Sequence, residues 1–133
     1  MNGCLDKIRI SVVIPVLNEE QNIDRCLCSL QSFDDIIVVD SGSTDSTKEL
    51  VSRYDVKFVK FTWNGSYPKK RNWALENLDL KYEWVLFLDA DEKITPEVTN
   101  ELRSVPNSLN EGYYLTYTNY FLGRKMRFGI PMK

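Results

Sequence analysis

Histidine is absent from this sequence of 133 residues. Without an imidazole, the chain cannot build a Ser-His-Asp or Cys-His nucleophilic triad, and it cannot form a histidine-ligated metal site. Any chemistry that the protein performs must therefore use carboxylates, amides, hydroxyl groups and cations.

Cysteine is scarce, with only Cys4, Cys26 and Cys28. An odd number of cysteines without C-x-x-C spacing argues against both a disulfide framework and a zinc site. We expect reduced structural thiols. Cys26 and Cys28 are two positions apart in a predicted helix, so they should face different directions.

Long hydrophobic runs are also missing. No apolar segment approaches the roughly 20 residues that a membrane-spanning helix needs. The charged Asp6, Lys7 and Arg9 leave no apolar signal core near the N-terminus. We therefore expect a location in the cytoplasm or at the inner face of the membrane. The net charge of -2 gives no indication of general nucleic-acid binding.

The sequence instead alternates short apolar runs with segments of helical periodicity. The apolar runs predict strands at residues 10–15, 35–40, 56–61, 84–88 and 113–122. Between them, apolar residues recur at helical spacing. This order predicts an α/β fold, a Rossmann-like and mostly parallel sheet flanked by helices, formed as a single domain over residues 1–133.

Three helix starts can be predicted from capping residues. Asn18 is expected to cap the first helix, with Glu19 and Glu20 at its positive end. Pro68 is expected to open the helix that follows the third strand, and Thr95 precedes a proline that can open the last helix.

Polar side chains collect where predicted strands end. Asn18 and Glu19 follow the first strand, Asp40 ends the second, and Asp89 and Asp91 follow the fourth. In open α/β sheets, ligands bind beyond the carboxyl ends of the strands, near the point where the strand order reverses. Helix capping alone is the simpler explanation for Asn18, but two acids two residues apart cannot both serve one cap.

The Asp-x-Asp sequence on a strand exit is a metal-binding arrangement. Hard divalent cations such as Mg²⁺ and Mn²⁺ prefer carboxylate oxygens, and they need few protein ligands where phosphates supply the rest. The tripeptide alone is common by chance. Its weight comes from the buried strand before Asp89 and from the other acids expected nearby.

Three blocks, ISVVIPVLNE over residues 10–19, VVDSGSTDST over 38–47 and LFLDAD over 86–91, resemble inverting family 2 glycosyltransferases of the GT-A fold. The basic segment KKRNWAL over residues 69–75 is similar to one that those enzymes carry between the second and third blocks. The tail over residues 112–124 more weakly resembles members that build lipopolysaccharide core or other surface glycans.

The resemblance implies a nucleotide-diphospho-sugar donor, UDP-linked by preference, and a glycan or lipid-linked acceptor in cell-surface polysaccharide synthesis. It implies that Asp91 and Asp89 hold Mn²⁺ or Mg²⁺, that Asp40 accepts a hydrogen bond from the base, and that Lys70 or Arg71 lies near the diphosphate. The complete set of donor-binding residues that it implies is Pro15, Leu17, Glu19, Asp40, Lys70, Arg71, Asp89, Ala90 and Asp91.

The resemblance lacks one element, because an inverting transfer needs a carboxylate base and the last acid of the sequence is Glu111. We expect the base beyond residue 133, so that the chain is the donor half with the acceptor part truncated. A module completed by another chain and a short, weakly active enzyme are the alternatives. An exposed final strand would also favour a homodimer.

Other classes fit the residues less well. A phosphatase of the haloacid dehalogenase type would place its two acids near the chain start and would not follow them with Glu92-Lys93. A nucleotidyltransferase would need a glycine-rich basic loop where Glu19 stands, and a dehydrogenase would need G-x-G-x-x-G. A non-catalytic nucleotide-sugar-binding module remains the alternative outside enzymes.

Overall fold

The protein is described by a computed structural model that covers residues 6–62, 69–118, 120–122 and 124–125. Its central feature is a four-stranded, entirely parallel sheet in the order β3-β2-β1-β4. The strands are β1 (Ile10–Val16), β2 (Ile36–Asp40), β3 (Lys57–Lys60) and β4 (Trp84–Phe87). The predicted α/β class and parallel sheet are confirmed.

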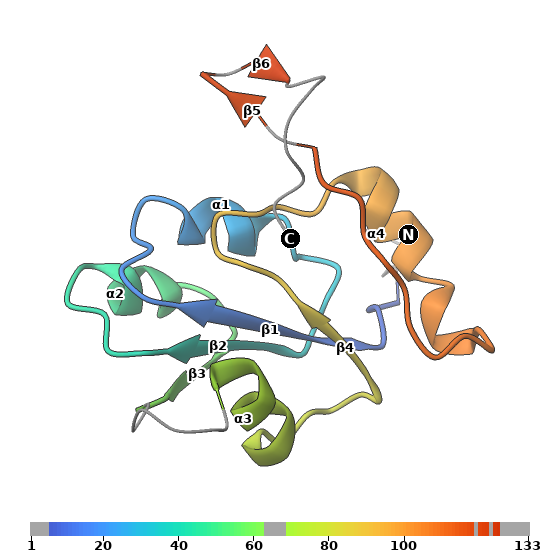
Figure 1. The fold of residues 1–133 in the computed structure, drawn as a ribbon, viewed down its shortest axis with the longest axis horizontal. Helices are drawn as coiled ribbons and strands as arrows, with labels where there is room; N and C mark the ends of the chain where they lie inside the picture. Colours follow the sequence, from blue (N-terminus) through green and yellow to red (C-terminus); the bar gives the residue numbers. More distant parts are fainter. Residues whose placement is uncertain (1–5, 63–68, 119, 123, 126–133) are drawn as a thin grey trace, which may run out of the picture.

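Helices cover both faces of the sheet, as Figure 1 shows. On one face, α1 (Ile23–Cys28), α2 (Thr47–Val51) and α4 (Pro96–Leu102) pack over the larger core cluster. On the other face, α3 (Lys70–Asn77) covers a smaller cluster. A short 3-10 helix, η1 (Val105–Asn107), follows α4. The sheet is therefore the middle layer of three.

The strand order reverses between β1 and β4. From β1 the chain adds β2 and then β3 on one side, and it then crosses to place β4 on the other side of β1. All four strands run in the same direction, so their carboxyl ends emerge at one edge, on the left in Figure 1. This edge is where an open α/β sheet binds its ligand.

A buried carboxylate, that of Asp35, joins the strands at the edge of the sheet where they begin, opposite the carboxyl edge. The Asp35 side chain is only 2% exposed and accepts hydrogen bonds from the Ser11 hydroxyl, the Lys57 ammonium group and the Lys81 backbone N–H. Burial raises the pKa of Asp35, but the hydrogen bonds from Ser11, Lys81 and Lys57 outweigh it and leave the pKa below its usual value. Asp35 therefore ties β1, β2, β3 and the segment before β4 together.

The last predicted strand, residues 113–122, is confirmed at Tyr120–Phe121 and wrong over residues 113–118. Residues 113–118 form no regular element, and only a two-residue antiparallel pair follows, β5 (Tyr120–Phe121) with β6 (Arg124–Lys125). The Tyr114 side chain is fully exposed, and the Tyr113 ring packs against Trp84 at 5.7 Å between centroids. The alternating aromatic residues of this segment have no partner strand, so the edges of the main sheet are β3 and β4.

The predicted cap of the first helix is also wrong. α1 begins at Ile23 after Asn22, whereas Asn18 adopts a left-handed conformation with φ 53°. The Asn18 side-chain oxygen accepts the Thr44 N–H at 2.8 Å, so it joins the loop after β1 to the loop after β2. The Thr95 cap is confirmed, since its hydroxyl accepts the Val98 N–H. Pro68 lies outside the described residues.

Candidate functional site

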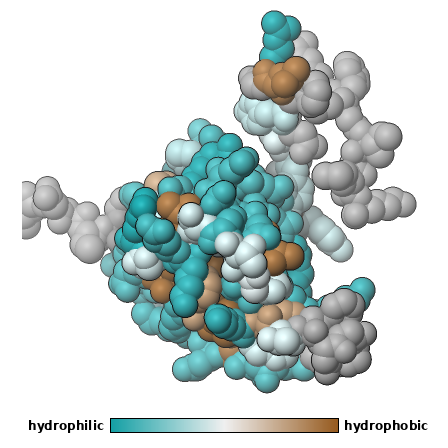
Figure 2. Space-filling view, turned by 90° about the vertical axis from the view of Figure 1, so that its left-hand side faces the viewer, coloured by the Kyte–Doolittle hydropathy of each residue, from teal (hydrophilic) through white to brown (hydrophobic). Residues whose placement is uncertain are grey.

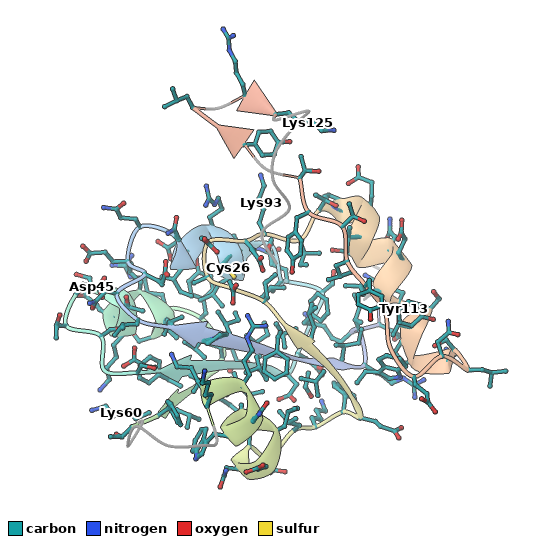
Figure 3. The ribbon with its side chains drawn as sticks, viewed as in Figure 1. Cys26, Asp45, Lys60, Lys93, Tyr113 and Lys125 are labelled. Carbon is teal, nitrogen blue, oxygen red and sulfur yellow. The ribbon has the colours of Figure 1, made fainter. Side chains whose placement is uncertain are left out.

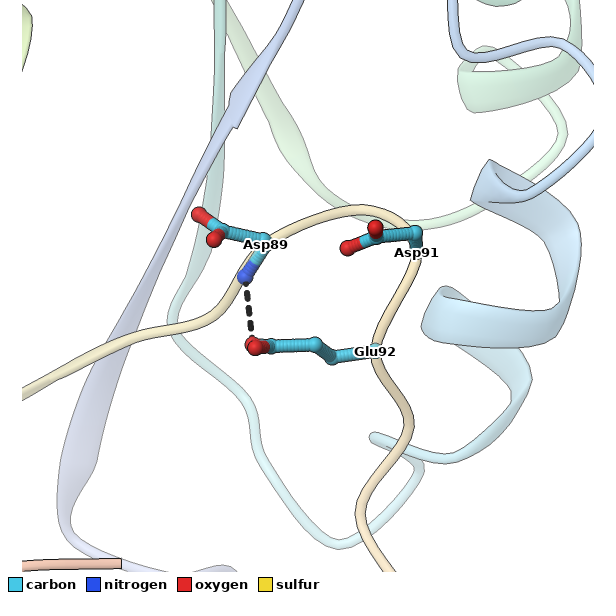
Figure 4. A group of neighbouring side chains, drawn as sticks. All are labelled: Asp89, Asp91 and Glu92. Atoms are coloured by element: carbon cyan, nitrogen blue, oxygen red, sulfur yellow. Dashed lines mark hydrogen bonds between the residues drawn. The ribbon is translucent and has the colours of Figure 1, made fainter. Parts of the chain in front are cut away.

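Three carboxylates converge on the turn after β4, as Figure 4 shows. Asp89, Asp91 and Glu92 each offer one oxygen, and these oxygens lie within 4.8 Å of one another. Glu92 reaches back across the turn, where its Oε2 accepts the Asp89 N–H at 2.9 Å. Glu92 is not among the site residues that the sequence motifs implied. Its position three residues after Asp89 is the signal that a turn would bring the two together.

The charges of this acid turn (Asp89, Asp91 and Glu92) act on one another. Burial raises the pKa of Glu92, and the negative charges of Asp89 and Asp91 raise it further. Burial raises the pKa of Tyr117, and the negative charges of Glu92 and Asp89 raise it further. The phenol of this tail residue therefore lies near the acid turn. A concentration of negative charge at half-exposed carboxylates favours binding of a cation.

Arg71 on α3 supplies the nearest counter-charge. Its guanidinium donates to Asp89 Oδ1 at 2.6 Å, and the two side chains are 54% and 48% exposed. The same guanidinium lies over the Phe87 ring, 5.5 Å from its centroid. The pair is therefore oriented by a neighbouring aromatic ring but remains in contact with solvent, where an arriving anion can reach the arginine.

Lys70 brings a second cation to the carboxyl edge. Its ammonium group donates to the Val16 carbonyl at the end of β1, at 3.0 Å. Burial lowers the pKa of Lys70, and the charge of Asp40 opposes that shift. The α3 N-terminus thus presents one cation beside β1 and another beside the acid turn.

Side chains of α1 and of its C-cap residue form hydrogen bonds with backbone groups of the acid turn and of the segment after it. Arg25 donates to the Asp91 carbonyl at 3.4 Å, the Cys26 thiol donates to the Asp89 carbonyl at 3.8 Å, and the Ser29 hydroxyl accepts the Ile94 N–H at 3.1 Å. Figure 3 shows Cys26 on the side of α1 that faces this segment. Burial, with added repulsion from Glu92 and Asp91, raises the pKa of Cys26 to about 12, so its thiol stays protonated.

Asp40 is buried at the end of β2 and shapes the next turn. Its carboxylate accepts the N–H groups of Gly42, at 3.0 Å, and Ser43, at 3.0 and 3.2 Å. Gly42 has φ 100°, a conformation that glycine adopts without strain. Asp40 therefore fixes the loop that carries Ser43 and Thr44, and its predicted contact with a base stays a prediction.

The remaining predicted residues lie along the same edge. Pro15 is half-buried in β1, while Leu17 follows the strand and is 53% exposed. Glu19 accepts from the Asn22 amide at 3.0 Å and is part-buried, and Ala90 is buried within the acid turn. Figure 2 shows this end of the molecule, a mostly hydrophilic surface with a few scattered hydrophobic side chains.

The acid turn fits a hard divalent cation. Its donors are carboxylate oxygens alone, they come from one turn, and Asp91 is exposed to solvent. Such a cation keeps several water or phosphate ligands when few protein oxygens are present. The residues that could hold it are Asp91, Asp89 and Glu92, of which Asp89 is shared with Arg71.

A parallel sheet with an Asp-x-Asp turn after β4, beside the point where the strand order reverses, is the arrangement of a GT-A glycosyltransferase. The chain belongs to glycosyl transferase family 2, whose family model matches residues 11–118. The family and fold that the sequence motifs implied are confirmed.

Curated relatives carry the same description. An uncharacterized glycosyltransferase of Rickettsia bellii is 36% identical over 110 residues, which make up 82% of this chain and 36% of the relative. The lipopolysaccharide core biosynthesis glycosyltransferase LpsC of Rhizobium meliloti is 31% identical over 126 residues, 90% of this chain and 46% of LpsC. The chain therefore spans less than half the length of these relatives.

Solved structures give a looser match. Glucosyl-3-phosphoglycerate synthase from Mycobacterium tuberculosis, solved in complex with Mg²⁺ and uridine diphosphate, is 29% identical with a TM-score of 0.45. The match covers 63% of this chain and 34% of the synthase. Separately, none of the helices in the described part of the chain is long and apolar enough to cross a membrane.

Proposed function

We propose that this chain binds the nucleotide-diphospho-sugar donor of a family 2 glycosyltransferase, together with Mg²⁺ or Mn²⁺. The observation that carries the proposal is the acid turn, three carboxylates within 4.8 Å of one another, with Arg71 beside them. A divalent cation would balance the negative charge of the carboxylates, and a diphosphate would balance the positive charge of Arg71. The carboxylates face the metal, and the arginine faces the phosphate oxygens.

Within this proposal each residue has a task. Asp91 would hold the metal, with Glu92 and one oxygen of Asp89 completing the carboxylate set. The other oxygen of Asp89 would accept from the ribose hydroxyls once Arg71 binds the diphosphate instead of Asp89. When bound, the metal supplies Lewis-acid stabilisation of the leaving nucleoside diphosphate, an effect of several kcal/mol. Lys70 adds positive charge at the end of β1, where its ammonium group already lies beside the Val16 carbonyl.

The nucleoside is assigned to the β1 and β2 ends. Pro15, Leu17 and Glu19 line its place, and Asp40 accepts from the base, exchanging one of its bonds to the Gly42–Ser43 turn. A uracil or thymine offers an imide N–H to such a carboxylate, and cytosine does not. This contact does not separate uridine from thymidine, and a uridine donor is favoured only through the family resemblance.

The whole reaction is the transfer of the sugar to a glycan or lipid-linked acceptor in surface polysaccharide synthesis, and the likeness to LpsC supports that acceptor class. The second candidate is a nucleotide-sugar-binding module without transfer. Sugar transfer by the purified chain decides between them.

Pairing of two copies through a strand edge would involve β3 or β4, and sedimentation at rising concentration tests it.

Donor binding is tested by calorimetry with UDP, TDP, GDP and CDP, each with and without Mn²⁺. We expect UDP to bind in a Mn²⁺-dependent manner and Asp91→Asn to weaken that binding at least about tenfold, because one charge-assisted ligand is lost. Asp55→Asn, the same change at an exposed acid in the turn after α2, is the matched control. Equal UDP affinity for the parent and Asp91→Asn chains in Mn²⁺ would contradict the metal assignment.

A further inference from the structure

A second polar groove lies at the other end of the sheet from the acid turn. It is lined by the segment that leads into β1, by the C-cap residue of α4 and by η1, and its volume is about 420 Å³. The lining residues are Asp6, Lys7, Ile8, Arg9, Arg103, Pro106 and Asn107. Because β1 separates this amino-end groove from the donor edge, the groove plays no part in the proposed donor site.

The amino-end groove has an excess of positive charge. Lys7, Arg9 and Arg103 line it, and Asp6 supplies its acid. The hydrogen bonds found for the three cations all go to neutral oxygens: the Gln31 carbonyl for Lys7, the Asn107 amide for Arg9, and the Asp6 carbonyl and a serine hydroxyl for Arg103. Neutral acceptors orient a cation without cancelling its charge.

The two arginines are already held in place. Arg103 is half-buried, and its two terminal nitrogens donate separately, to the Asp6 carbonyl at 2.7 Å and to Ser32 Oγ at 3.3 Å. Arg9 donates to Asn107 Oδ1 at 2.8 Å. A guanidinium group has five N–H donors, so each arginine keeps donors for a further ligand. Ordering them before the ligand arrives lowers the entropy cost of binding.

We propose that the amino-end groove binds a phosphate group, with Arg9 and Arg103 as its principal donors and Lys7 as a third cation. The fork of a guanidinium matches the oxygens of a phosphate, and the charge of the groove complements a mono- or dianion. A free phosphate ester and the headgroup of an anionic phospholipid share this chemistry. Either ligand would bind independently of the nucleotide donor.

Inorganic phosphate is the first probe. The ¹⁵N-labelled chain is titrated in EDTA, on an Arg71→Gln background, so that the acid turn and its arginine do not contribute. We expect saturable shifts of the amides of Lys7, Arg9 and Arg103. Arg9→Gln should weaken binding about tenfold, the loss of one charge-assisted contact. Arg53→Gln removes an equal charge from the exposed pair with Glu49, does not alter the lining of the groove, and should leave the affinity unchanged.

Arg103→Gln should weaken phosphate binding similarly, and circular dichroism checks that this variant folds, since Arg103 also ties two segments together. If it does not fold, Arg9→Gln still decides the matter, because its partner Asn107 is exposed. Phosphate binding that does not saturate, or that Arg53→Gln weakens as much as Arg9→Gln does, would contradict a site for free phosphate. The proposal would then stand only if the vesicles described below bind through the same arginines.

Vesicles separate the two sources of phosphate. Sedimentation with phosphatidylcholine alone is compared with phosphatidylcholine that contains phosphatidic acid. Sedimentation that needs phosphatidic acid and is lost in Arg9→Gln identifies the lipid headgroup as the ligand. Binding of inorganic phosphate without vesicle binding identifies a small phosphate ester. Absence of both interactions would refute the site.

Discussion

Two carboxylate–cation pairs in this protein have the same charges but different surroundings. Asp35 is 2% exposed and its partner Lys57 is 56% exposed, whereas Asp89 and Arg71 are both about half exposed. A buried carboxylate that is separated from its hydrogen-bond donors is left as an unpaired charge away from water, which costs much free energy. Asp35 therefore keeps its partners in the folded protein. Water can replace either partner of the exposed pair at little cost, so Arg71 is able to exchange Asp89 for a ligand.

Asp35→Asn should lower the free energy of unfolding by about 1–3 kcal/mol at pH 7, since the amide nitrogen cannot accept from Ser11, Lys57 or the Lys81 N–H. Urea denaturation measures the loss. Asp55→Asn, at an exposed position, should cost less than about 0.5 kcal/mol.

The same carboxylate predicts an acid dependence. The pKa of Asp35 is lowered in the folded chain, so the unfolded state takes up the proton first. The contribution of Asp35 to stability is complete above its unfolded pKa of about 3.9 and is lost as the pH falls below that value, through the folded pKa. The unfolding free energy of Asp35→Asn should therefore fall less steeply below pH 4 than that of the parent. Parallel curves would contradict the assignment.

At the scale of elements, the site depends on short helices held by side chains. α1 has only six residues, too few for a stable isolated helix. The side chains of Arg25, Cys26 and the C-cap residue Ser29 nevertheless hold the backbone of the acid turn and the residues after it. Ile23, Cys26 and Leu27 are buried on one face of α1, and their packing in the larger core cluster fixes the helix on the sheet. The position of the carboxylates is therefore set by α1 as well as by β4.

Ser29→Ala should weaken Mn²⁺ binding severalfold, because the Ser29 hydroxyl accepts the Ile94 N–H and donates to the Cys26 carbonyl. The loss of one hydrogen bond is worth about 1 kcal/mol. Paramagnetic relaxation of water protons measures Mn²⁺ affinity without nucleotide. Ser52→Ala is the matched control, since Ser52 also caps a helix, α2, and donates to a carbonyl, that of Glu49, but within the described residues makes no hydrogen bond to the segment of the acid turn. Equal Mn²⁺ affinities for the two variants would exclude a positioning role.

At the scale of the whole molecule, the two faces of the sheet are covered unequally. Among the residues that the structure describes, three α-helices pack on one face, whereas α3 is the only helix on the other and carries both Lys70 and Arg71. The position of these cations therefore depends on how α3 is packed. Ala74 of α3 is buried in the smaller core cluster, and Trp73 packs on Phe61 with the ring centroids 5.1 Å apart.

Trp73→Ala should lower the unfolding free energy by about 2–4 kcal/mol, because the aromatic pair and the cluster beneath it lose their cover. The affinity for UDP should fall as well, since α3 then holds Lys70 and Arg71 less firmly. Leu75→Ala on the same helix, where the side chain is 52% exposed, serves as the control and should change both quantities little. Urea denaturation and calorimetry measure the two effects. Full UDP affinity in a destabilised Trp73→Ala chain would separate the site from α3.

The sequence by itself determined the parallel α/β fold, the family and the position of Asp89 and Asp91 at a strand exit. These follow from local patterns: β-branched runs such as 36–39 form buried strands wherever they pair, and acids after a strand lie at its carboxyl end. Only the tertiary structure decided that Glu92 joins the acids, that Asn18 links two loops and that residues 113–118 form no strand. Each of these depends on a backbone turn or on a partner distant in sequence, and the periodicity of a segment does not record which partner it will meet.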